Sequence, residues 1–217
     1  MDYVVIDTTT REGWLLARES GIGGSDAASV IGANPYKSNV RLFEEKTGQR
    51  KPEDISERPY VAYGTAAEPL IRELFRLDYP EYLVEHHENR ILRSTKWTFM
   101  QASLDGELTD RDGRKGILEI KTSNMMGAAA WGKWEDRIPD NYYCQILHYF
   151  LVTGYEFAVL RAHLVYQKDR DVRTAVRHYF LERDEVREDM EYLADMEREF
   201  WGRVLTGRKP SLILPGL

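Results

Sequence analysis

Residues 101–122, Q-A-S-L-D-G-E-L-T-D-R-D-G-R-K-G-I-L-E-I-K-T, contain the pattern from which the rest of the sequence is best understood. Aromatic and apolar residues over 97–104 predict one strand, and alternating apolar and polar residues over 116–122 predict a second. Residues 109–113, rich in Asp and Gly, are typical of a turn between strands. The pattern therefore predicts two strands joined by a polar turn.

Three charged side chains are expected to meet at one end of these strands. Side chains two apart on a strand leave the same face, so Glu119 and Lys121 point the same way. Leu118 and Ile120 then point into the core. Asp105 ends the preceding strand, and it comes beside this pair if the two strands are neighbours. Two carboxylates and an ammonium group at one strand end can hold a divalent metal ion and a water molecule.

Such a group of side chains suits the hydrolysis of phosphate esters. Mg²⁺ binds carboxylate oxygens, keeps several waters and takes further ligands from substrate phosphates. The metal polarises a phosphoryl oxygen and helps to generate hydroxide near neutral pH. A nearby lysine can orient or help to deprotonate the attacking water, and its charge can stabilise the pentavalent phosphate. The same residues allow a simpler interpretation, in which Glu119 and Lys121 form the solvated face of an edge strand.

The order of the motifs adds a resemblance to a known family. Asp105 followed by Glu119-Ile120-Lys121 resembles the active site of the PD-(D/E)-x-K nuclease superfamily, with Leu104 in the place of the proline. The chain as a whole resembles nucleases of the phage lambda exonuclease type, specifically the YqaJ viral recombinase family. Four segments carry this resemblance in the family's order: 14–34, 63–75, 102–123 and 142–154. It implies an α/β, restriction-endonuclease-like fold, with a central mixed sheet of about five strands and helices on both faces.

The resemblance also implies a role for each residue of the predicted metal site. Asp105 and Glu119, with the carbonyl group of Ile120, would hold Mg²⁺ or Mn²⁺. Lys121 would prepare the attacking water. Glu68 matches the carboxylate of the family's Gly-x-x-x-Glu segment and would support a second ion. Two ions fit an in-line displacement, with one at the attacking oxygen and one at the leaving oxygen.

Two of the predicted site residues lie on expected helices and have simpler interpretations. Pro69 is expected in the first turn of a helix, which would place Glu68 at the helix start, where the helix dipole favours a carboxylate. Residues 141–153 show the apolar spacing of a helix with one core face. Gln145 lies on a different face that could look toward the metals, and it matches a family Gln near the scissile phosphate. It could equally be an ordinary surface residue of that helix.

An anion-binding pocket is predicted closer to the N-terminus. The glycines over 21–24 break one helix, and Ser25 opens another. Free backbone N–H groups and a hydroxyl at a helix start suit an anion, and Arg18 can add a bidentate guanidinium group. By resemblance, Arg18 and Ser25 bind the 5′-phosphate of a DNA end. Without the resemblance, Ser25 is simply an N-cap and Arg18 a surface charge. The glycines are not a G-x-G-x-x-G motif after a strand, which excludes a dinucleotide site.

Length and composition predict a soluble globular protein. A chain of 217 residues can bury roughly 70% of its unfolded surface. No apolar run approaches the ~18–20 residues that span a bilayer, and no signal peptide opens the chain. We expect one nuclease domain over 1–217, with an extended tail at 208–217. The apolar residues 212–214 in that tail are expected to dock on folded protein, a neighbouring subunit included.

Charge and cysteine content bear on the mode of nucleic-acid binding and on the cellular compartment. The net charge of −6 argues against loose electrostatic adhesion to nucleic acid, although a local basic groove is compatible with an acidic total. The single cysteine, Cys144, excludes internal disulfides and an all-cysteine metal cluster. A reducing compartment is therefore expected, and the cytoplasm fits best.

The function implied by the resemblance is hydrolysis of one strand of linear duplex DNA from its 5′ end, leaving a 3′ overhang for phage-type recombination. The resemblance also implies a ring-shaped homotrimer that encloses DNA and works with a single-strand annealing protein. Three alternatives stay open. The same metal site would serve a site- or structure-specific endonuclease. A non-catalytic DNA-end-binding protein, or an interaction protein with a fortuitous E-x-K motif, would not hydrolyse DNA.

Overall fold

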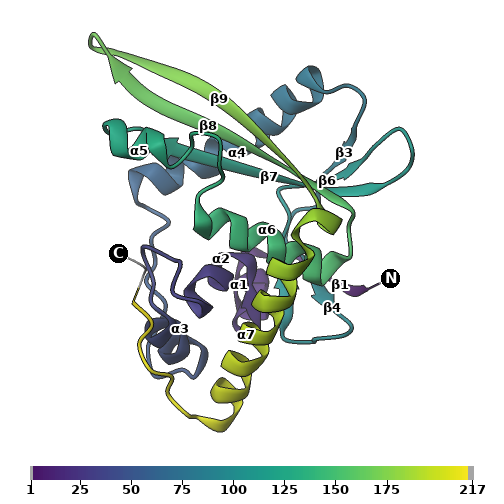
Figure 1. Ribbon diagram of the computed structural model, residues 1–217, viewed down its shortest axis with the longest axis vertical. Coiled ribbons are helices and arrows are strands. Elements are labelled where there is room, and N and C mark those ends of the chain that lie inside the picture. The colour runs from purple at the N-terminus through teal and green to yellow at the C-terminus, as the bar shows by residue number, and fades with distance from the viewer. Residues whose placement is uncertain (1, 215–217) are drawn as a thin grey trace.

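The computed structural model describes residues 2–214, and its strands form two mixed sheets (Figure 1). In the larger sheet β7 runs parallel to β8, and the other neighbours are antiparallel. The strand order of this five-stranded sheet is β3 (Leu83–Glu85), β6 (Gly106–Thr109), β7 (Lys115–Asn124), β8 (Phe157–Lys168) and β9 (Asp171–Glu182). The prediction of an α/β fold around a mixed sheet is confirmed.

A smaller sheet, which the sequence did not predict, lies beside the larger one. Its β2 and β5 are parallel, while β1–β4 and β4–β5 are antiparallel. The order of this four-stranded sheet is β1 (Tyr3–Asp7), β4 (Arg90–Ser94), β5 (Met100–Ala102) and β2 (Ile22–Gly23).

The expected pairing of 97–104 with 116–122 is wrong in one respect. Within 97–104 the strand is β5, which belongs to the smaller sheet, whereas the strand that pairs with β7 is β6. The chain crosses between the two sheets just before Gly106. A side chain there would press on Leu118 across the pair, so the glycine lets β6 begin close to β7. Asp105 consequently stands at the crossing.

Helices cover both faces of the five-stranded sheet, as predicted (Figure 1). Helix α4 (Pro59–Asp78) packs Ile71 and Phe75 against Leu118 and Ile120 of β7. Helix α6 (Asp140–Thr153) lies on the opposite face, and with β7 and β8 it forms the largest apolar core. The face of β7 that carries Glu119 and Lys121 is therefore the α6 face.

Pro69 lies well inside α4, and its predicted place in the first turn is wrong. The proline that starts this helix is Pro59, whose fixed φ suits that position. An interior proline removes one helical hydrogen bond, but burial of Ile71 and Phe75 in the following turns holds the helix together. Glu68 thus lies in mid-helix, and the helix dipole cannot explain its presence.

The remaining helices are short except for the last. Thr10 caps α1, because its side chain accepts a hydrogen bond from the Gly13 N–H. Helix α2 begins at Gly24 and so includes Ser25, which was expected to open it. In chain order these helices are α1 (Arg11–Glu19), α2 (Gly24–Val30), α3 (Asn39–Lys46), α5 (Ala128–Gly132), the 3₁₀ helix η1 (Arg183–Val186) and α7 (Arg187–Thr206).

The β8–β9 hairpin projects from the body of the molecule (Figure 1). Its turn residues Asp169 and Arg170 both have positive φ, 51° and 72°. This geometry matches the right-handed twist of a two-residue hairpin. None of the described helices is long and apolar enough to cross a membrane.

The C-terminal tail docks on its own chain. The Asn39 side chain donates to the Ser211 carbonyl at 2.7 Å and accepts from the Ile213 N–H at 3.1 Å. Lys209 pairs with Glu44 at 2.7 Å. Up to residue 214 the docking expected of the tail is therefore intramolecular, while residues 215–217 of the predicted tail lie outside the described residues.

Candidate active site

A cavity of about 640 Å³ lies where the two sheets approach each other, with walls from α1, α2, α4 and α6. Its lining includes every side chain that the sequence predicted for the site: Arg18, Ser25, Glu68, Asp105, Glu119, Lys121 and Gln145. Ile120, predicted to contribute only its carbonyl group, lies between two of them on β7. The fold therefore brings the predicted residues into one place.

Glu119 is buried in the middle of the sheet. Its strand has β6 on one side and β8 on the other, and the residue is only 1% exposed. The interpretation of Glu119 as the solvated face of an edge strand is therefore wrong. Glu119 Oε1 accepts hydrogen bonds from Lys121 Nζ at 2.6 Å and Gln145 Nε2 at 2.7 Å. Its other oxygen, Oε2, is buried with no partner among the described residues.

Asp105 lies across the strand pair from Glu119. The register pairs Gly106 with Leu118, which brings the residue before Gly106 next to Glu119. Asp105 Oδ2 accepts a hydrogen bond from the Ile120 N–H at 2.8 Å. The two carboxylates therefore lie next to each other, as the sequence predicted, but where β6 begins beside the middle of β7.

The electrostatics of this pair disfavour the ionisation of both carboxyl groups at once. Burial raises the pKa of Glu119 to about 8, and the charge of Asp105 adds to the rise. Burial, together with the charge of Glu68, raises the pKa of Asp105 to about 6. Burial alone would lower the pKa of Lys121, but the charges of Glu119 and Asp105 outweigh it and raise that pKa. Lys121 is therefore an ammonium group at neutral pH, and one ammonium faces two desolvated carboxylates.

A divalent cation fits this arrangement. The unpartnered Glu119 Oε2 is an oxygen donor in need of a positive partner. Within residues 2–214, no three His, Cys, Asp or Glu side chains are arranged as a ligand group. Asp105 and Glu119 would therefore be the main protein ligands, with the Ile120 carbonyl beside them. A site with few protein ligands, completed by water and substrate oxygens, is typical of Mg²⁺.

The backbone at Asp105 is held by two residues that the sequence did not reveal. Buried Arg72 donates from Nη1 to the Asp105 carbonyl and to Glu68 Oε1, the latter at 3.1 Å. His86 Nδ1 lies 3.1 Å from the same carbonyl. The spacing of Glu68 and Arg72 does indicate a helical ion pair. The contact of Arg72 with the Asp105 carbonyl, 33 residues away, left no signal in the sequence.

The predicted anion pocket is also assembled. Arg18 Nη2 donates to Ser25 Oγ at 3.1 Å, and the guanidinium lies over the Trp14 ring, 4.4 Å from its centre. Trp14 Nε1 in turn donates to Ser103 Oγ at 3.1 Å. The contacts with Trp14 and Ser25 hold the guanidinium group in place and leave its other N–H groups as donors.

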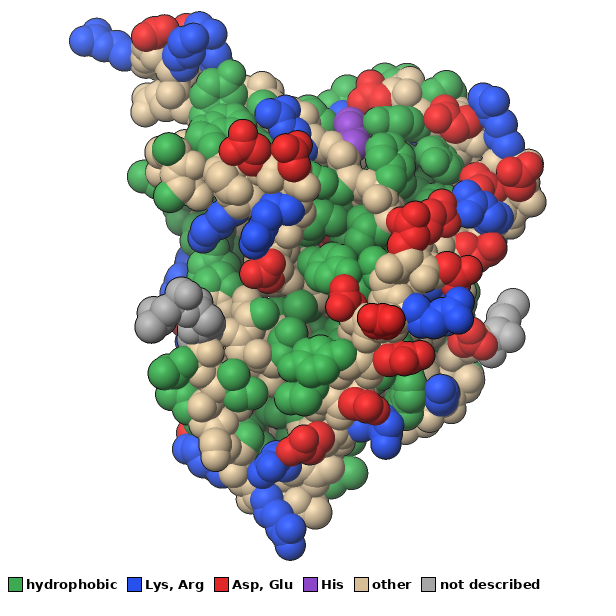
Figure 2. All heavy atoms as spheres, viewed as in Figure 1, with side chains coloured by type: hydrophobic (Ala, Val, Ile, Leu, Met, Phe, Trp, Pro, Cys, Tyr) green, Lys and Arg blue, Asp and Glu red, His purple; other side chains and the backbone are tan. Residues whose placement is uncertain are grey.

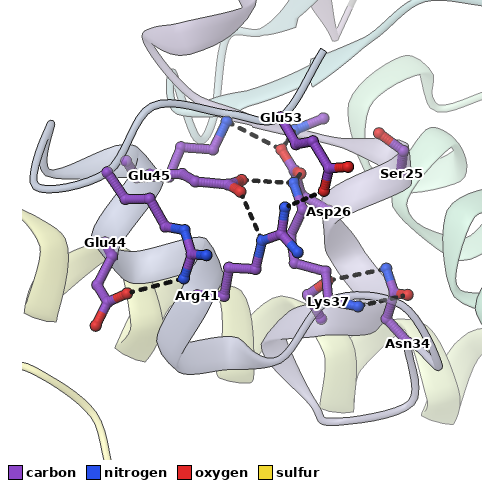
Figure 3. Close-up of polar contacts among 12 residues, drawn as sticks. Ser25, Asp26, Asn34, Lys37, Arg41, Glu44, Glu45 and Glu53 are labelled. Carbon is purple, nitrogen blue, oxygen red and sulfur yellow. Dashed lines mark hydrogen bonds and ion pairs between the residues drawn. The ribbon is translucent and has the colours of Figure 1, made fainter. Parts of the chain in front are cut away.

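A buried ionic network supports this pocket from behind (Figure 3). Asp26 pairs with Lys46 at 2.9 Å and with Lys37 at 3.6 Å, and it also accepts from the Gly23 N–H at 3.3 Å. Burial would raise the pKa of Asp26, but the two lysines outweigh it and lower the pKa to about 2. Lys46 also reaches the Arg18 carbonyl at 3.5 Å. The network therefore fixes α2 relative to both α1 and α3.

Comparisons with known proteins identify a family for this chain. The family model described as the YqaJ-like viral recombinase domain matches residues 13–156. The uncharacterized protein YqaJ of Bacillus subtilis (strain 168) is 30% identical over 204 residues, which cover 94% of this chain. The chain spans only 59% of the length of that relative.

Two solved structures have a similar fold. One is the alkaline exonuclease LHK-Exo from Laribacter hongkongensis, with a TM-score of 0.63, 19% identity, and coverage of 90% of this chain and 95% of that one. The other is a phage-related exonuclease from Haemophilus somnus 129PT, with a TM-score of 0.54, 14% identity, and coverage of 86% and 96%. At these identities the similarity concerns the fold. The matched residues 13–156 include all the predicted site residues, and the chain belongs to the family of the YqaJ-like viral recombinase domain.

Proposed function

We propose that the protein is a metal-dependent deoxyribonuclease that degrades one strand of linear duplex DNA from its 5′ end and leaves a 3′ overhang. The observation that carries the proposal is the buried, unpartnered Glu119 Oε2 beside Asp105, with Lys121 fixed at the other Glu119 oxygen. Family membership and the exonuclease-like fold support the same conclusion.

Each of the predicted residues in the cavity has its own role in the proposed reaction. Mg²⁺ or Mn²⁺, bound by Asp105, Glu119 and the Ile120 carbonyl, would supply a polarised phosphoryl oxygen and a more acidic water. Lys121, held protonated, donates a hydrogen bond to the attacking water and stabilises charge on the phosphate. The charges of Glu119 and Asp105 raise the pKa of Lys121, which favours the orienting role of its ammonium group. Glu68, which is partly exposed to the cavity, supports a second ion.

The end of the DNA is selected by the second half of the cavity. Arg18 and Ser25 lie on α1 and α2, which line the cavity together with β7. A terminal 5′-phosphate bound there places the adjoining phosphodiester at the carboxylates. An endonuclease has no need of such a pocket, and this is what favours the exonuclease over it.

The proposal is tested with linear duplex DNA that carries either a 5′-phosphate or a 5′-hydroxyl, in Mg²⁺ or EDTA, beside closed circular DNA. We expect Mg²⁺-dependent loss of one strand, faster from the 5′-phosphate and abolished in Lys121→Ala. Lys96→Ala, at an exposed lysine outside the cavity, is the control and should cut normally. Cutting of the closed circle would favour the endonuclease, and DNA binding without any cutting would favour an end-binding protein.

The assembly implied by the family is part of the proposal. We propose a ring-shaped homotrimer around duplex DNA that acts with a single-strand annealing protein. The face shown in Figure 2 carries scattered basic groups, a row of acidic groups and a central hydrophobic area. That mixture does not favour loose adhesion of this face to DNA. Sedimentation velocity with and without DNA tests the trimer, and a monomer under both conditions would contradict it.

A further inference from the structure

Tyr149 connects Gln145 on α6 with the segment before Asp105 through its hydroxyl group. It lies one helical turn after Gln145 on α6 and is 4% exposed. The hydroxyl donates to the Ser103 carbonyl at 2.8 Å and accepts from Gln145 Nε2 at 2.9 Å. Ser103 is two residues before Asp105, so a hydrogen-bonded path runs from Glu119 through Gln145 and Tyr149 to the segment that carries Asp105.

The partners of Tyr149 determine which way the Gln145 amide faces. A carbonyl oxygen can only accept, so the single proton of the Tyr149 hydroxyl is directed at Ser103. Toward Gln145 the hydroxyl must then accept, which requires the amide nitrogen on that side. Glu119 Oε1 also accepts from the amide nitrogen, which lies 2.7 Å away. Both amide hydrogens are thus used, and Gln145 Oε1 is left as an acceptor in a residue that lines the cavity.

The ring of Tyr149 packs against Gly24, a contact that does not involve its hydroxyl group. Gly24, the first residue of α2, lies so close to the ring that a Cβ there would overlap it. The ring therefore sets how near Ser25 can approach the carboxylates. A change that removes the hydroxyl and keeps the ring should leave the anion pocket intact.

We propose that Tyr149 is a positioning residue for Gln145, whose amide it holds with the nitrogen on Glu119 and the oxygen facing the attacking water or the phosphate. The inference rests on the proposed nuclease function and deepens it. The spacing of four residues places Tyr149 on the same face of α6 as Gln145. Its role follows only from the contacts with Ser103 and Gln145.

The test compares Tyr149→Phe, Gln145→Ala and the double variant with the wild type. Tyr155→Phe is the matched control, because the Tyr155 hydroxyl also has two partners, Tyr3 and Glu107, but does not line the cavity. We expect Tyr149→Phe to lower kcat at least about tenfold, since a misplacement of about 1 Å costs up to roughly 100-fold. KM for 5′-phosphorylated DNA and the preference for the 5′-phosphate should stay within about twofold, because the ring remains.

The double variant tests whether Tyr149 acts through Gln145. If it does, Tyr149→Phe causes no further loss in the Gln145→Ala background. A second readout is independent of activity: the side-chain amide signal of Gln145 in a ¹⁵N-correlated NMR spectrum, assigned by its disappearance in Gln145→Ala. That signal should shift or lose intensity in Tyr149→Phe and stay in place in Tyr155→Phe.

The outcomes separate the two proposals. A wild type that hydrolyses DNA, with Tyr149→Phe equal to it in kcat and in the amide signal, would overturn the role of Tyr149 alone. Losses that multiply in the double variant would also overturn it. A wild type that hydrolyses no DNA would overturn the proposed function, and with it the catalytic part of this inference.

Discussion

Lys121 Nζ lies 2.6 Å from Glu119 Oε1, on a strand face that α6 covers. The ammonium also lies 4.9 Å from the centre of the Tyr142 ring, which stacks on Trp134. These contacts hold the lysine head in one place, although one fifth of the side chain is exposed. The geometry explains how a residue with a long, flexible side chain can serve as a fixed charge.

Replacing this lysine should remove activity and leave the fold. Lys121→Met keeps most of the side-chain length but removes the charge that faces the phosphate. We expect kcat to fall by about 100- to 1,000-fold, the cost of removing one donor to a developing charge. The measurement is the initial rate of strand loss from 5′-phosphorylated duplex DNA in Mg²⁺.

The fold of Lys121→Met should survive at pH 7 because Glu119 can take up a proton. The pKa of Glu119 is already about 8 with the lysine in place, and loss of the ammonium raises it further. No uncompensated charge is then buried. Circular dichroism should show an intact fold, and a variant that keeps activity within tenfold of the wild type would contradict the role of Lys121.

Arg18→Lys should reduce the discrimination between DNA ends. A lysine at this position can neither donate two parallel hydrogen bonds nor stack on Trp14 as the guanidinium does at 4.4 Å. Loss of a hydrogen bond to a charged group corresponds to about tenfold or more in the rate ratio of 5′-phosphate to 5′-hydroxyl ends. The measurement is kcat/KM for the two substrates.

Arg11→Lys is the matched control for Arg18→Lys. Arg11 also lies over the Trp14 ring, at 5.2 Å from its centre, and lines the same cavity, but it does not contact Ser25. It should keep the wild-type ratio. Equal losses in both variants would mean that the arginines contribute only general positive charge.

The strand that carries Glu119 and Lys121 could be predicted because its signal is local. Alternation of apolar and polar residues fixes which side chains share a face, whatever the neighbouring strands are. The same reasoning placed Gln145 on a helix face turned toward the carboxylates. These residues meet in the structure because β7 and α6 pack directly on each other.

The rest of the site depends on contacts that have no local pattern. Arg72 and His86 reach the Asp105 carbonyl from an interior helix turn and a loop. The crossing of the chain between two sheets at Asp105 could not be predicted either, because apolar residues over 97–104 suit a strand in any sheet. Pro69 misled the interpretation of α4, since tertiary packing outweighed a local preference.

Asp26→Asn should change the pH dependence of stability in one direction. The pKa of Asp26 is lowered from 3.8 to about 2, so the folded state favours its charged form. The associated stability, about 2 kcal/mol by linkage, is present above pH 3.8 and is lost as the pH falls through 2. The wild type should therefore exceed Asp26→Asn in stability most at pH 7, and the difference should shrink below pH 4.

Urea unfolding at several pH values between 7 and 2.5 measures this difference. Glu57→Gln, at an exposed position in the segment before α4, is the control and should run parallel to the wild type. Parallel curves for Asp26→Asn and the wild type would show that Lys37 and Lys46 do not stabilise the carboxylate. Because the network fixes α2, we also expect Asp26→Asn to weaken the preference for 5′-phosphate ends.

Asn39→Ala should release the C-terminal tail without unfolding the protein. The side chain makes two hydrogen bonds to the tail backbone, at Ser211 and Ile213, and Asn39 is 1% exposed. Loss of both bonds weakens a docked segment that leaves Leu212 and Leu214 largely exposed. We expect the Ile213 amide to exchange with solvent at least about tenfold faster, which corresponds to roughly 1.4 kcal/mol.

Ser211→Ala keeps the backbone carbonyl that Asn39 contacts, so its Ile213 amide should exchange as in the wild type. Unchanged exchange in Asn39→Ala would show that the tail is held by its other contacts, chiefly Ile213 against Gly32 and the pair of Lys209 with Glu44.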